Sequence, residues 1–118
     1  IVAAGGVAEA FAKVRELAAT LPIEIEVDTI EQLRVALSAG ADVVLLDNMP
    51  PAVLREAVAV SQEHETLTGH AVLLEASGGL TLDTAKAVAE TGVHFISVGG
   101  ITHSSPILDI GLDLQTII

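Results

Sequence analysis

The chain has 118 residues, of which 51 % are hydrophobic, and a formal net charge of −11. This charge excludes a nucleic-acid site built on a basic surface, and two aromatic residues are too few for base stacking. No cysteine is present, which excludes disulfide bonds and thiolate chemistry, and no apolar run reaches the roughly 18 residues that span a membrane. We therefore expect a cytoplasmic protein that partners neither nucleic acid nor membrane.

Helical and strand patterns alternate along the chain. In order, they predict helix 7–19, strand 23–27, helix 30–38, strand 43–46, helix 51–62, strand 70–75, helix 82–90 and strand 94–98. Glycine and proline residues mark several of the boundaries, and the polar stretch 63–69 is expected to be a connector. The tail contains a turn at 104–106 and an alternating pattern at 108–114.

This order of elements predicts parallel strands joined by right-handed helical crossovers, the arrangement of an α/β fold. The first strand carries Glu24, Glu26 and Asp28 on the face opposite its apolar residues. Such a row favours a barrel over an open sheet, because a barrel interior accommodates polar groups near its mouth. The pattern gives about four βα units, roughly half of an eight-stranded barrel. Since half a barrel leaves two open strand edges, we expect the sequence to be a fragment of a longer chain.

Two carboxylates, Glu26 and Asp47, end neighbouring predicted strands. Barrel active sites lie at the carboxyl ends of the strands, so both are candidate catalytic, substrate-binding and metal-binding groups. Carboxylates at such a place bind sugar hydroxyls, hold Mg²⁺ together with substrate phosphates, or balance a buried lysine. The structural alternative is an ion pair or a helix cap. Glu75, at the end of an apolar run, leaves a comparable choice between a site residue and the anchor of a lysine elsewhere.

Two glycine turns follow the third and fourth predicted strands, and they contain Ser77, Gly78, Gly79, Gly99 and Gly100. Glycine lets a backbone approach a phosphate closely, and the free N–H groups of a following helical turn point at it. His103 lies in the loop after the second turn, where it can donate to a phosphate or pyrophosphate oxygen. The structural alternatives are ordinary turns and a loop histidine. Together these residues predict a phosphate-binding region.

The positive charges lie away from these strand ends. All five lysines and arginines fall in predicted helices, so cations for a polyanionic ligand must come from outside the sequence, from another subunit or from Mg²⁺. The remaining histidines, His64, His70 and His94, lie outside the carboxyl ends of the strands and show no metal-site spacing. We expect these three to be structural or exposed.

Six short motifs occur in order along the chain: Glu-Ile-Glu-Val-Asp (24–28), Leu-Leu-Asp-Asn-Met (45–49), Leu-Glu-Ala-Ser-Gly-Gly (74–79), Thr-Gly-Val (91–93), Ser-Val-Gly-Gly-Ile-Thr-His-Ser (97–104) and Leu-Asp-Ile-Gly-Leu (108–112). Together they resemble the quinolinate phosphoribosyltransferase family, the carboxylating nicotinate-nucleotide diphosphorylases. The resemblance implies that residues 1–118 are the C-terminal portion of an incomplete parallel α/β barrel. It also implies that an N-terminal domain and the first barrel strands are absent from this sequence.

By resemblance, the activity is transfer of a phosphoribosyl group from phosphoribosyl pyrophosphate to quinolinate with Mg²⁺, giving nicotinate mononucleotide, pyrophosphate and CO₂ in NAD biosynthesis. Glu26 and Asp47 would face the ribose hydroxyls and the Mg²⁺. The phosphate region would be lined by Ser77, Gly78, Gly79, Gly99, Gly100 and His103. The family's site is completed by the neighbouring subunit of a homodimer, so we expect the isolated chain to be inactive.

The chain departs from the family pattern at Gly100-Ile101, where the family more often has Ala-Leu. The family's Lys-Asp-Asn-His motif and the arginines that bind the two carboxylates of quinolinate belong upstream of residue 1. The half of the site that specifies the substrate therefore lies outside the sequence. Two alternatives follow: a paralogous barrel pyrophosphorylase of the molybdenum-transport-associated type, and a non-catalytic phosphate-binding barrel fragment.

Overall fold

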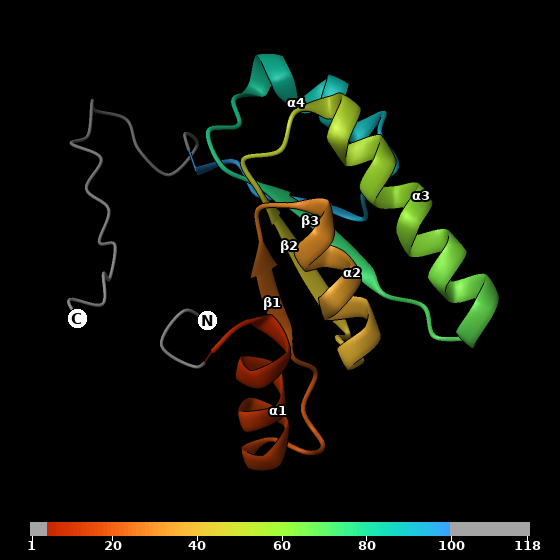
Figure 1. Ribbon diagram of the computed structural model, residues 1–118. Coiled ribbons are helices and arrows are strands. Elements are labelled where there is room, and N and C mark those ends of the chain that lie inside the picture. The colour runs from red at the N-terminus through yellow and green to blue at the C-terminus, as the bar shows by residue number, and fades with distance from the viewer. Residues whose placement is uncertain (1–4, 100–118) are drawn as a thin grey trace.

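The computed structural model describes residues 5–99, in which helices and strands strictly alternate (Figure 1). The elements are α1 (Val7–Leu17), β1 (Glu24–Val27), α2 (Ile30–Ala39), β2 (Val43–Asp47), α3 (Pro51–Thr68), β3 (Leu73–Ser77), α4 (Leu82–Ala89) and β4 (Phe95–Ile96). The order is the one that the sequence pattern predicts, and each helix and strand predicted before residue 99 overlaps an observed one.

Local capping interactions explain where the second helix begins and ends. The Thr29 hydroxyl accepts a hydrogen bond from the backbone N–H of Gln32 at 3.2 Å, which satisfies one of the unpaired donors of the first turn of α2. Gly40 ends the same helix in the left-handed conformation, with φ at 86°. Both residues fix the length of α2 and therefore the place where β2 starts.

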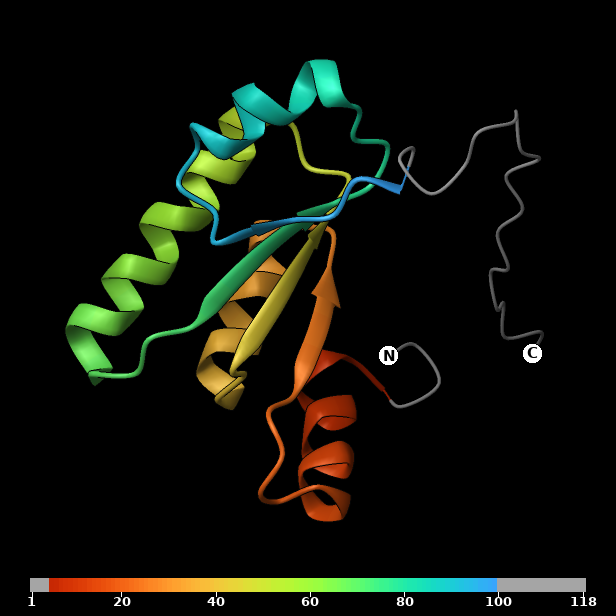
Figure 2. The same cartoon turned by 180° about the vertical axis from the view of Figure 1, so that it is seen from behind.

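The four strands form one parallel sheet in the order β1-β2-β3-β4 (Figures 1 and 2). The register places Glu26 opposite Leu45, Leu45 opposite Glu75, and Glu75 opposite Phe95. Neighbours in the chain are neighbours in the sheet, as in a barrel, whereas a doubly wound sheet reverses its strand order at a switch point. The predicted α/β class with parallel strands is confirmed.

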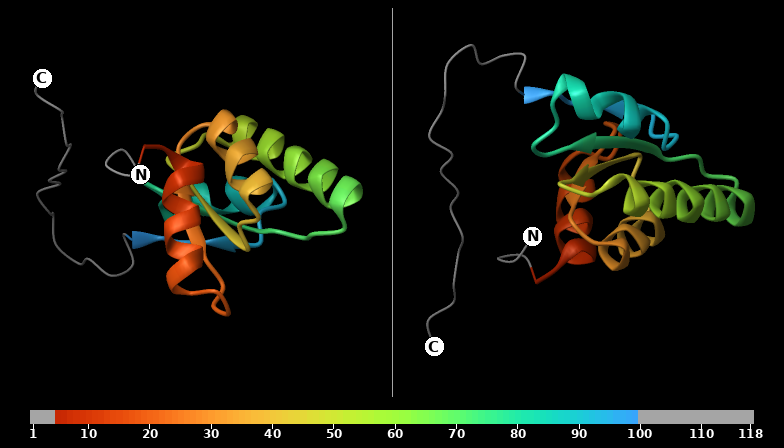
Figure 3. Two further views of the ribbon diagram at one scale, coloured as in Figure 1. Left: turned by 60° about the horizontal axis from the view of Figure 1, so that its bottom comes forward. Right: turned by 90° about the horizontal axis from the view of Figure 1, so that it is seen from above.

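The helices and one face of the sheet form the hydrophobic core (Figure 3). Its largest fully buried side chains come from α2, α3, α4 and the first three strands: Leu33, Leu46, Leu54, Leu74, Val27, Val44 and Val88. Burial of one such side chain contributes about 1.5–3 kcal/mol. Because α1 packs on α2, α2 on α3 and α3 on α4, the helices form one continuous outer layer.

The opposite face of the sheet, which we call the open face, carries every second residue of the strands: Glu24, Glu26, Val43, Leu45, Asp47, Leu73, Glu75, Ser77 and Phe95. Glu24 and Glu26 are exposed, while Ile25 and Val27 between and after them are buried. The predicted acidic face of the first strand is therefore confirmed. This face corresponds to the interior of a closed barrel.

The third helix is longer than predicted. α3 runs to Thr68, whereas the sequence pattern predicts a helix end near residue 62 and a connector over 63–69. The additional residues are mostly polar and exposed, so they lack the apolar periodicity on which the prediction depends. Thr66 and Thr68 donate side-chain hydrogen bonds to carbonyls one turn earlier, and Gly69 ends the helix at φ 74°.

The third and fourth strands are shorter than predicted. β3 begins at Leu73 rather than near residue 70, and β4 contains only Phe95 and Ile96. The predicted turn and alternating pattern of the tail lie outside the described residues. Within residues 5–99, no helix combines the length and the apolar character that crossing a bilayer requires.

Candidate functional site

Glu26 and Asp47 lie on the open face, at the carboxyl ends of adjacent strands. Glu26 pairs with Leu45 in the register of β1 and β2, so Asp47 lies two residues further along the same face. From strand geometry this offset is roughly 6–7 Å along the sheet, combined with one strand spacing across it. Glu26 is exposed and Asp47 is half-buried. Both carboxylates are accessible to one ligand that spans the ends of β1 and β2.

The carboxylate of Asp47 is bonded to the end of the next strand. The Ser77 hydroxyl donates a hydrogen bond to Asp47 Oδ1 at 3.3 Å. The backbone N–H of Asn48 donates to the Ser77 carbonyl at 2.9 Å, and Asn48 itself has a positive φ of 52°. A side-chain bond and a backbone bond therefore tie the end of β2 to the end of β3.

Gly78 is required by this close approach of two strand ends. It has φ at 85°, and a Cβ built on it would lie 2.6 Å from the Asn48 backbone nitrogen and 2.7 Å from Asp47 Oδ1. Real Cβ atoms do not approach backbone atoms so closely, so a side chain at residue 78 would displace the Asp47–Asn48 turn. Gly79 also has a positive φ, 59°, with its nearest neighbour at 3.9 Å. The clash with Asp47 and Asn48 thus explains why residue 78 is a glycine. The contact of Gly78 with phosphate stays a prediction.

The second predicted glycine turn is only partly described. A Cβ on Gly99 would meet no heavy atom of the described residues within 4 Å. Gly100 and His103 lie outside the described residues. The assignment of these three residues to a phosphate region stays a prediction.

The Glu75 carboxylate accepts a hydrogen bond from a hydroxyl group. From the sequence, Glu75 is either a site residue or the anchor of a lysine elsewhere. The Ser97 hydroxyl donates to Glu75 Oε1, and the backbone N–H of Ser97 donates to the Ala76 carbonyl at 2.9 Å. Sequence reasoning does not single out Ser97 as a partner. The pairing follows from the register of β3 and β4, which places Glu75 opposite Phe95 and Ser97 two residues beyond.

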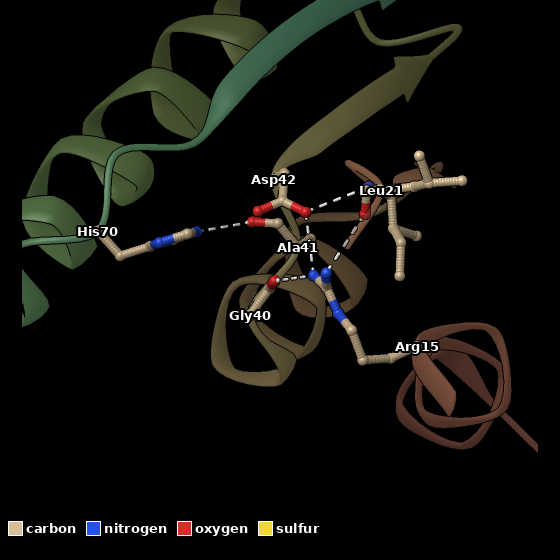
Figure 4. A network of polar contacts seen from close by, with 7 residues as sticks. Arg15, Leu21, Gly40, Ala41, Asp42 and His70 are labelled. Atoms are coloured by element: carbon tan, nitrogen blue, oxygen red, sulfur yellow. Dashed lines mark hydrogen bonds and ion pairs between the residues drawn. The ribbon is translucent and has the colours of Figure 1, made fainter. Parts of the chain in front are cut away.

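The amino end of the sheet carries an ion pair of structural character (Figure 4). Arg15 Nη2 lies 2.9 Å from Asp42 Oδ2 and donates to the Gly40 carbonyl at 3.1 Å. The backbone N–H of Ile23 donates to the same Asp42 oxygen at 3.1 Å. This hydrogen bond from Ile23, with the bond and the charge of Arg15, lowers the pKa of Asp42 below its usual value, although partial burial acts in the opposite direction.

The histidines of the described chain interact with the backbone or with each other. His70 Nε2 donates to the Ala41 carbonyl at 3.0 Å, since a carbonyl can only accept. His94 Nδ1 accepts from the backbone N–H of Leu74 at 3.0 Å. The rings of His64 and His70 meet edge to face. These contacts agree with the expectation that the three histidines are structural or exposed.

The donor set on the open face fits Mg²⁺. Among residues 5–99, no group of three or more His, Cys, Asp or Glu side chains is arranged to hold a metal ion. Mg²⁺ does not need such a group, because it keeps several waters and binds through one or two carboxylates together with substrate phosphates. Glu26 and Asp47 are oxygen donors of this kind, accessible on one face of the sheet.

The family model for the quinolinate phosphoribosyl transferase C-terminal domain matches residues 1–113. A relative from Mycobacterium leprae, named nicotinate-nucleotide pyrophosphorylase [carboxylating], is 46 % identical over 114 residues, which are 97 % of this chain and 39 % of the relative. The human protein of the same name is 38 % identical over 115 residues, 97 % of this chain and 37 % of its own length. The chain therefore spans less than two fifths of the curated relatives that it matches.

Solved structures show the same similarity. The nicotinate-nucleotide pyrophosphorylase from Francisella tularensis superimposes with a TM-score of 0.76 at 38 % identity, over 86 % of this chain and 34 % of that chain. The enzyme of the same name from Ehrlichia chaffeensis gives a TM-score of 0.78 at 34 % identity, over 98 % of this chain and 39 % of that chain. The helix and strand arrangement described above is thus shared with parts of these two longer chains.

Proposed function

The chain belongs to the quinolinate phosphoribosyl transferase family, and from this premise we propose that the protein carrying it joins quinolinate to the phosphoribosyl group of phosphoribosyl pyrophosphate. The products are nicotinate mononucleotide, pyrophosphate and CO₂, in NAD biosynthesis. The observation that supports the proposal in the structure is the pair Glu26 and Asp47 on the open face, at the carboxyl ends of adjacent strands. The family match favours this activity over the molybdenum-transport-associated paralogue and over a non-catalytic barrel.

In this reaction Glu26 and Asp47 bind the ribose hydroxyls and hold Mg²⁺. Breaking the bond between ribose and pyrophosphate develops positive charge on the ribose, and two nearby carboxylates stabilise that charge. Bound Mg²⁺ would neutralise part of the charge on the departing pyrophosphate. The phosphate groups lie at the glycine turns, close to Gly78, Gly79, Gly99, Gly100 and His103.

Quinolinate brings two carboxylates, and their cationic partners come from outside this chain. The five lysines and arginines all lie on helices and none lies on a strand: Lys13, Arg15, Arg34, Arg55 and Lys86. In this proposal the chain is the C-terminal part of the barrel, and the N-terminal domain and first barrel strands supply the remaining groups. We infer a cytoplasmic homodimer in which a second subunit completes the site.

The test is a steady-state assay of the full-length protein with quinolinate, phosphoribosyl pyrophosphate and Mg²⁺, following nicotinate mononucleotide by chromatography. Formation of nicotinate mononucleotide that requires all three components supports the proposal. If phosphoribosyl pyrophosphate binds but quinolinate is not consumed, the paralogous pyrophosphorylase becomes the better assignment. If neither substrate binds, the barrel is non-catalytic.

A further inference from the structure

We propose that Ser77 is a positioning residue, whose hydroxyl fixes the Asp47 carboxylate in the orientation used to bind ribose and Mg²⁺. This inference rests on the proposed function, because it acts through the role of Asp47. By resemblance Ser77 belongs to the phosphate region, as a direct contact of the ligand. Its side chain in the structure instead donates to Asp47 Oδ1, at 3.3 Å.

The geometry around this bond restrains both partners. Asp47 and Ser77 are paired in the register of β2 and β3, and the Asn48 N–H bond to the Ser77 carbonyl, at 2.9 Å, holds the two strand ends together. Within residues 5–99 the Asp47 carboxylate has no cationic partner, so the hydroxyl is the group that orients it. Because the bond engages Oδ1, Oδ2 stays available for a ligand.

The glycine that follows Ser77 is part of the same arrangement. A Cβ on Gly78 would lie 2.7 Å from Asp47 Oδ1, the atom that accepts the Ser77 hydrogen bond. The missing side chain at residue 78 therefore leaves that oxygen within reach of the hydroxyl. Ser77 and Gly78 thus act together on Asp47, one by donating a hydrogen bond and the other by leaving space.

The next pair of strands provides a matched control. Ser97, the residue directly after β4, donates a hydrogen bond to Glu75 on the same face. Removing that hydroxyl deletes a bond of the same kind without touching Asp47. If Ser77→Ala weakens the binding of phosphoribosyl pyrophosphate and Ser97→Ala does not, the loss is due to Asp47. A general weakening of the sheet would affect both variants.

The test is a double-mutant cycle in the full-length protein. Isothermal titration calorimetry measures the dissociation constant of phosphoribosyl pyrophosphate with Mg²⁺ for the wild type, Ser77→Ala, Asp47→Asn and the double variant. Loss of one hydrogen bond that orients a charged group is expected to weaken binding by roughly 3–10-fold in the wild-type background. In the Asp47→Asn background, Ser77→Ala is expected to change affinity by less than about twofold, because coupled residues are not additive.

Ser97→Ala is expected to leave the dissociation constant within about twofold of the wild type. Ser77→Cys, which keeps the size of the side chain but is a weak donor, is expected to reproduce Ser77→Ala, so the result does not depend on one variant folding. Equal fold-losses in both Asp47 backgrounds would overturn the proposal, since Ser77 would then contact the ligand itself. Unchanged affinity of Asp47→Asn would instead overturn the assignment of Asp47 in the proposed function.

Discussion

Two aspartates at opposite ends of β2 show how position decides the use of one residue type. Asp42, just before the strand, accepts hydrogen bonds from Arg15 and from the N–H of Ile23. Its negative charge is therefore neutralised by a partner in the same chain. Asp47, at the end of the strand, accepts only a hydroxyl among the described residues and faces the open side of the sheet. The first arrangement stabilises the fold, and the second leaves a carboxylate for a ligand.

Asp47→Asn is expected to lower kcat of the full-length protein by roughly 100-fold or more, because it removes a preorganised charge from the reacting ribose. The melting temperature is expected to change little, since Asp47 makes no ion pair within residues 5–99. Steady-state kinetics and differential scanning calorimetry measure the two effects. Asp42→Asn is the matched control and should show the reverse pattern, with lower stability and nearly unchanged kcat. A wild-type rate for Asp47→Asn would contradict the assignment.

The ion pair of Asp42 predicts a pH dependence of stability. Its pKa is lowered in the folded protein from an ordinary value of 3.8, so the folded state binds the proton less readily than the unfolded state. The stabilisation from Asp42 is therefore complete above that ordinary value and is lost as the pH falls through the lower folded pKa. At pH 7, Asp42→Asn is expected to reduce the free energy of unfolding by about 1 kcal/mol. Urea unfolding between pH 7 and pH 3 should show this difference shrinking below about pH 4, and a constant difference would contradict it.

Gly78 and Gly99 are expected to respond differently to alanine. Gly78→Ala places a Cβ 2.6 Å from the Asn48 nitrogen at a positive φ, so it should lower the free energy of unfolding, by about 1–3 kcal/mol. Gly99→Ala meets no described atom within 4 Å, so the stability should stay within about 0.5 kcal/mol. If Gly99 lines the phosphate region, its variant should instead raise KM for phosphoribosyl pyrophosphate. Thermal unfolding and steady-state kinetics of both variants separate the two effects, and equal stability losses would refute this distinction.

At the scale of elements, the end of α3 is set by one glycine rather than by apolar periodicity. Gly69 has φ at 74° and its N–H bonds the Glu65 carbonyl at 2.8 Å. The polar residues before it extend the helix past the predicted end, because their backbone bonds continue to a residue that can adopt the left-handed conformation. The position of this helix end sets the length of the connection to β3.

Gly69→Ala is therefore expected to destabilise the protein by about 1 kcal/mol, the penalty for a Cβ in the left-handed region. Among residues 5–99 no heavy atom lies within 4 Å of the added Cβ, so the effect is conformational rather than steric. Chemical denaturation of the full-length protein measures the change. Glu63→Ala, an exposed substitution in the same part of α3, is the control and should stay within about 0.5 kcal/mol of the wild type. Similar values for both variants would contradict the role of the glycine.

At the scale of the whole molecule, the sheet has one face in the core and one that is only partly covered by its own chain. Leu73 and Phe95 on the open face are 40 % and 50 % exposed, next to carboxylates that lack cationic partners within residues 5–99. The chain spans 39 % of its relative from Mycobacterium leprae. We infer that the rest of the full-length protein covers this face and supplies the cations.

A protein consisting of residues 1–118 alone is thus expected to form no nicotinate mononucleotide and to self-associate through its exposed apolar side chains and the edge strands of its sheet. The assay of the full-length protein, applied to this fragment, measures the first effect, and analytical ultracentrifugation measures the second. Addition of the remaining part of the protein as a separate chain should restore part of the activity. Turnover by the fragment alone would show that the cations for quinolinate are not where we propose.

The sequence by itself determined the order of helices and strands, the two faces of β1 and the residues that end α2. These properties follow from signals that neighbouring residues carry: alternation along a strand, spacing along a helix, and a cap such as Thr29 or Gly40. The place of Glu26 and Asp47 at strand ends was predictable for the same reason. The end of α3 was not, because its last turns have no apolar stripe.

Only the tertiary structure decided which of these residues meet. The bond from Ser77 to Asp47 joins residues 30 positions apart, and the bond from Ser97 to Glu75 joins residues 22 positions apart. Both depend on the register between strands, which is specified when one face of the whole sheet is buried against its helices. The reason for glycine at 78 belongs here too, since the clash it avoids is with the end of another strand. The order of residues in the sequence predicted polar groups at the carboxyl ends of the strands. Three-dimensional packing decided which of them form hydrogen bonds with one another.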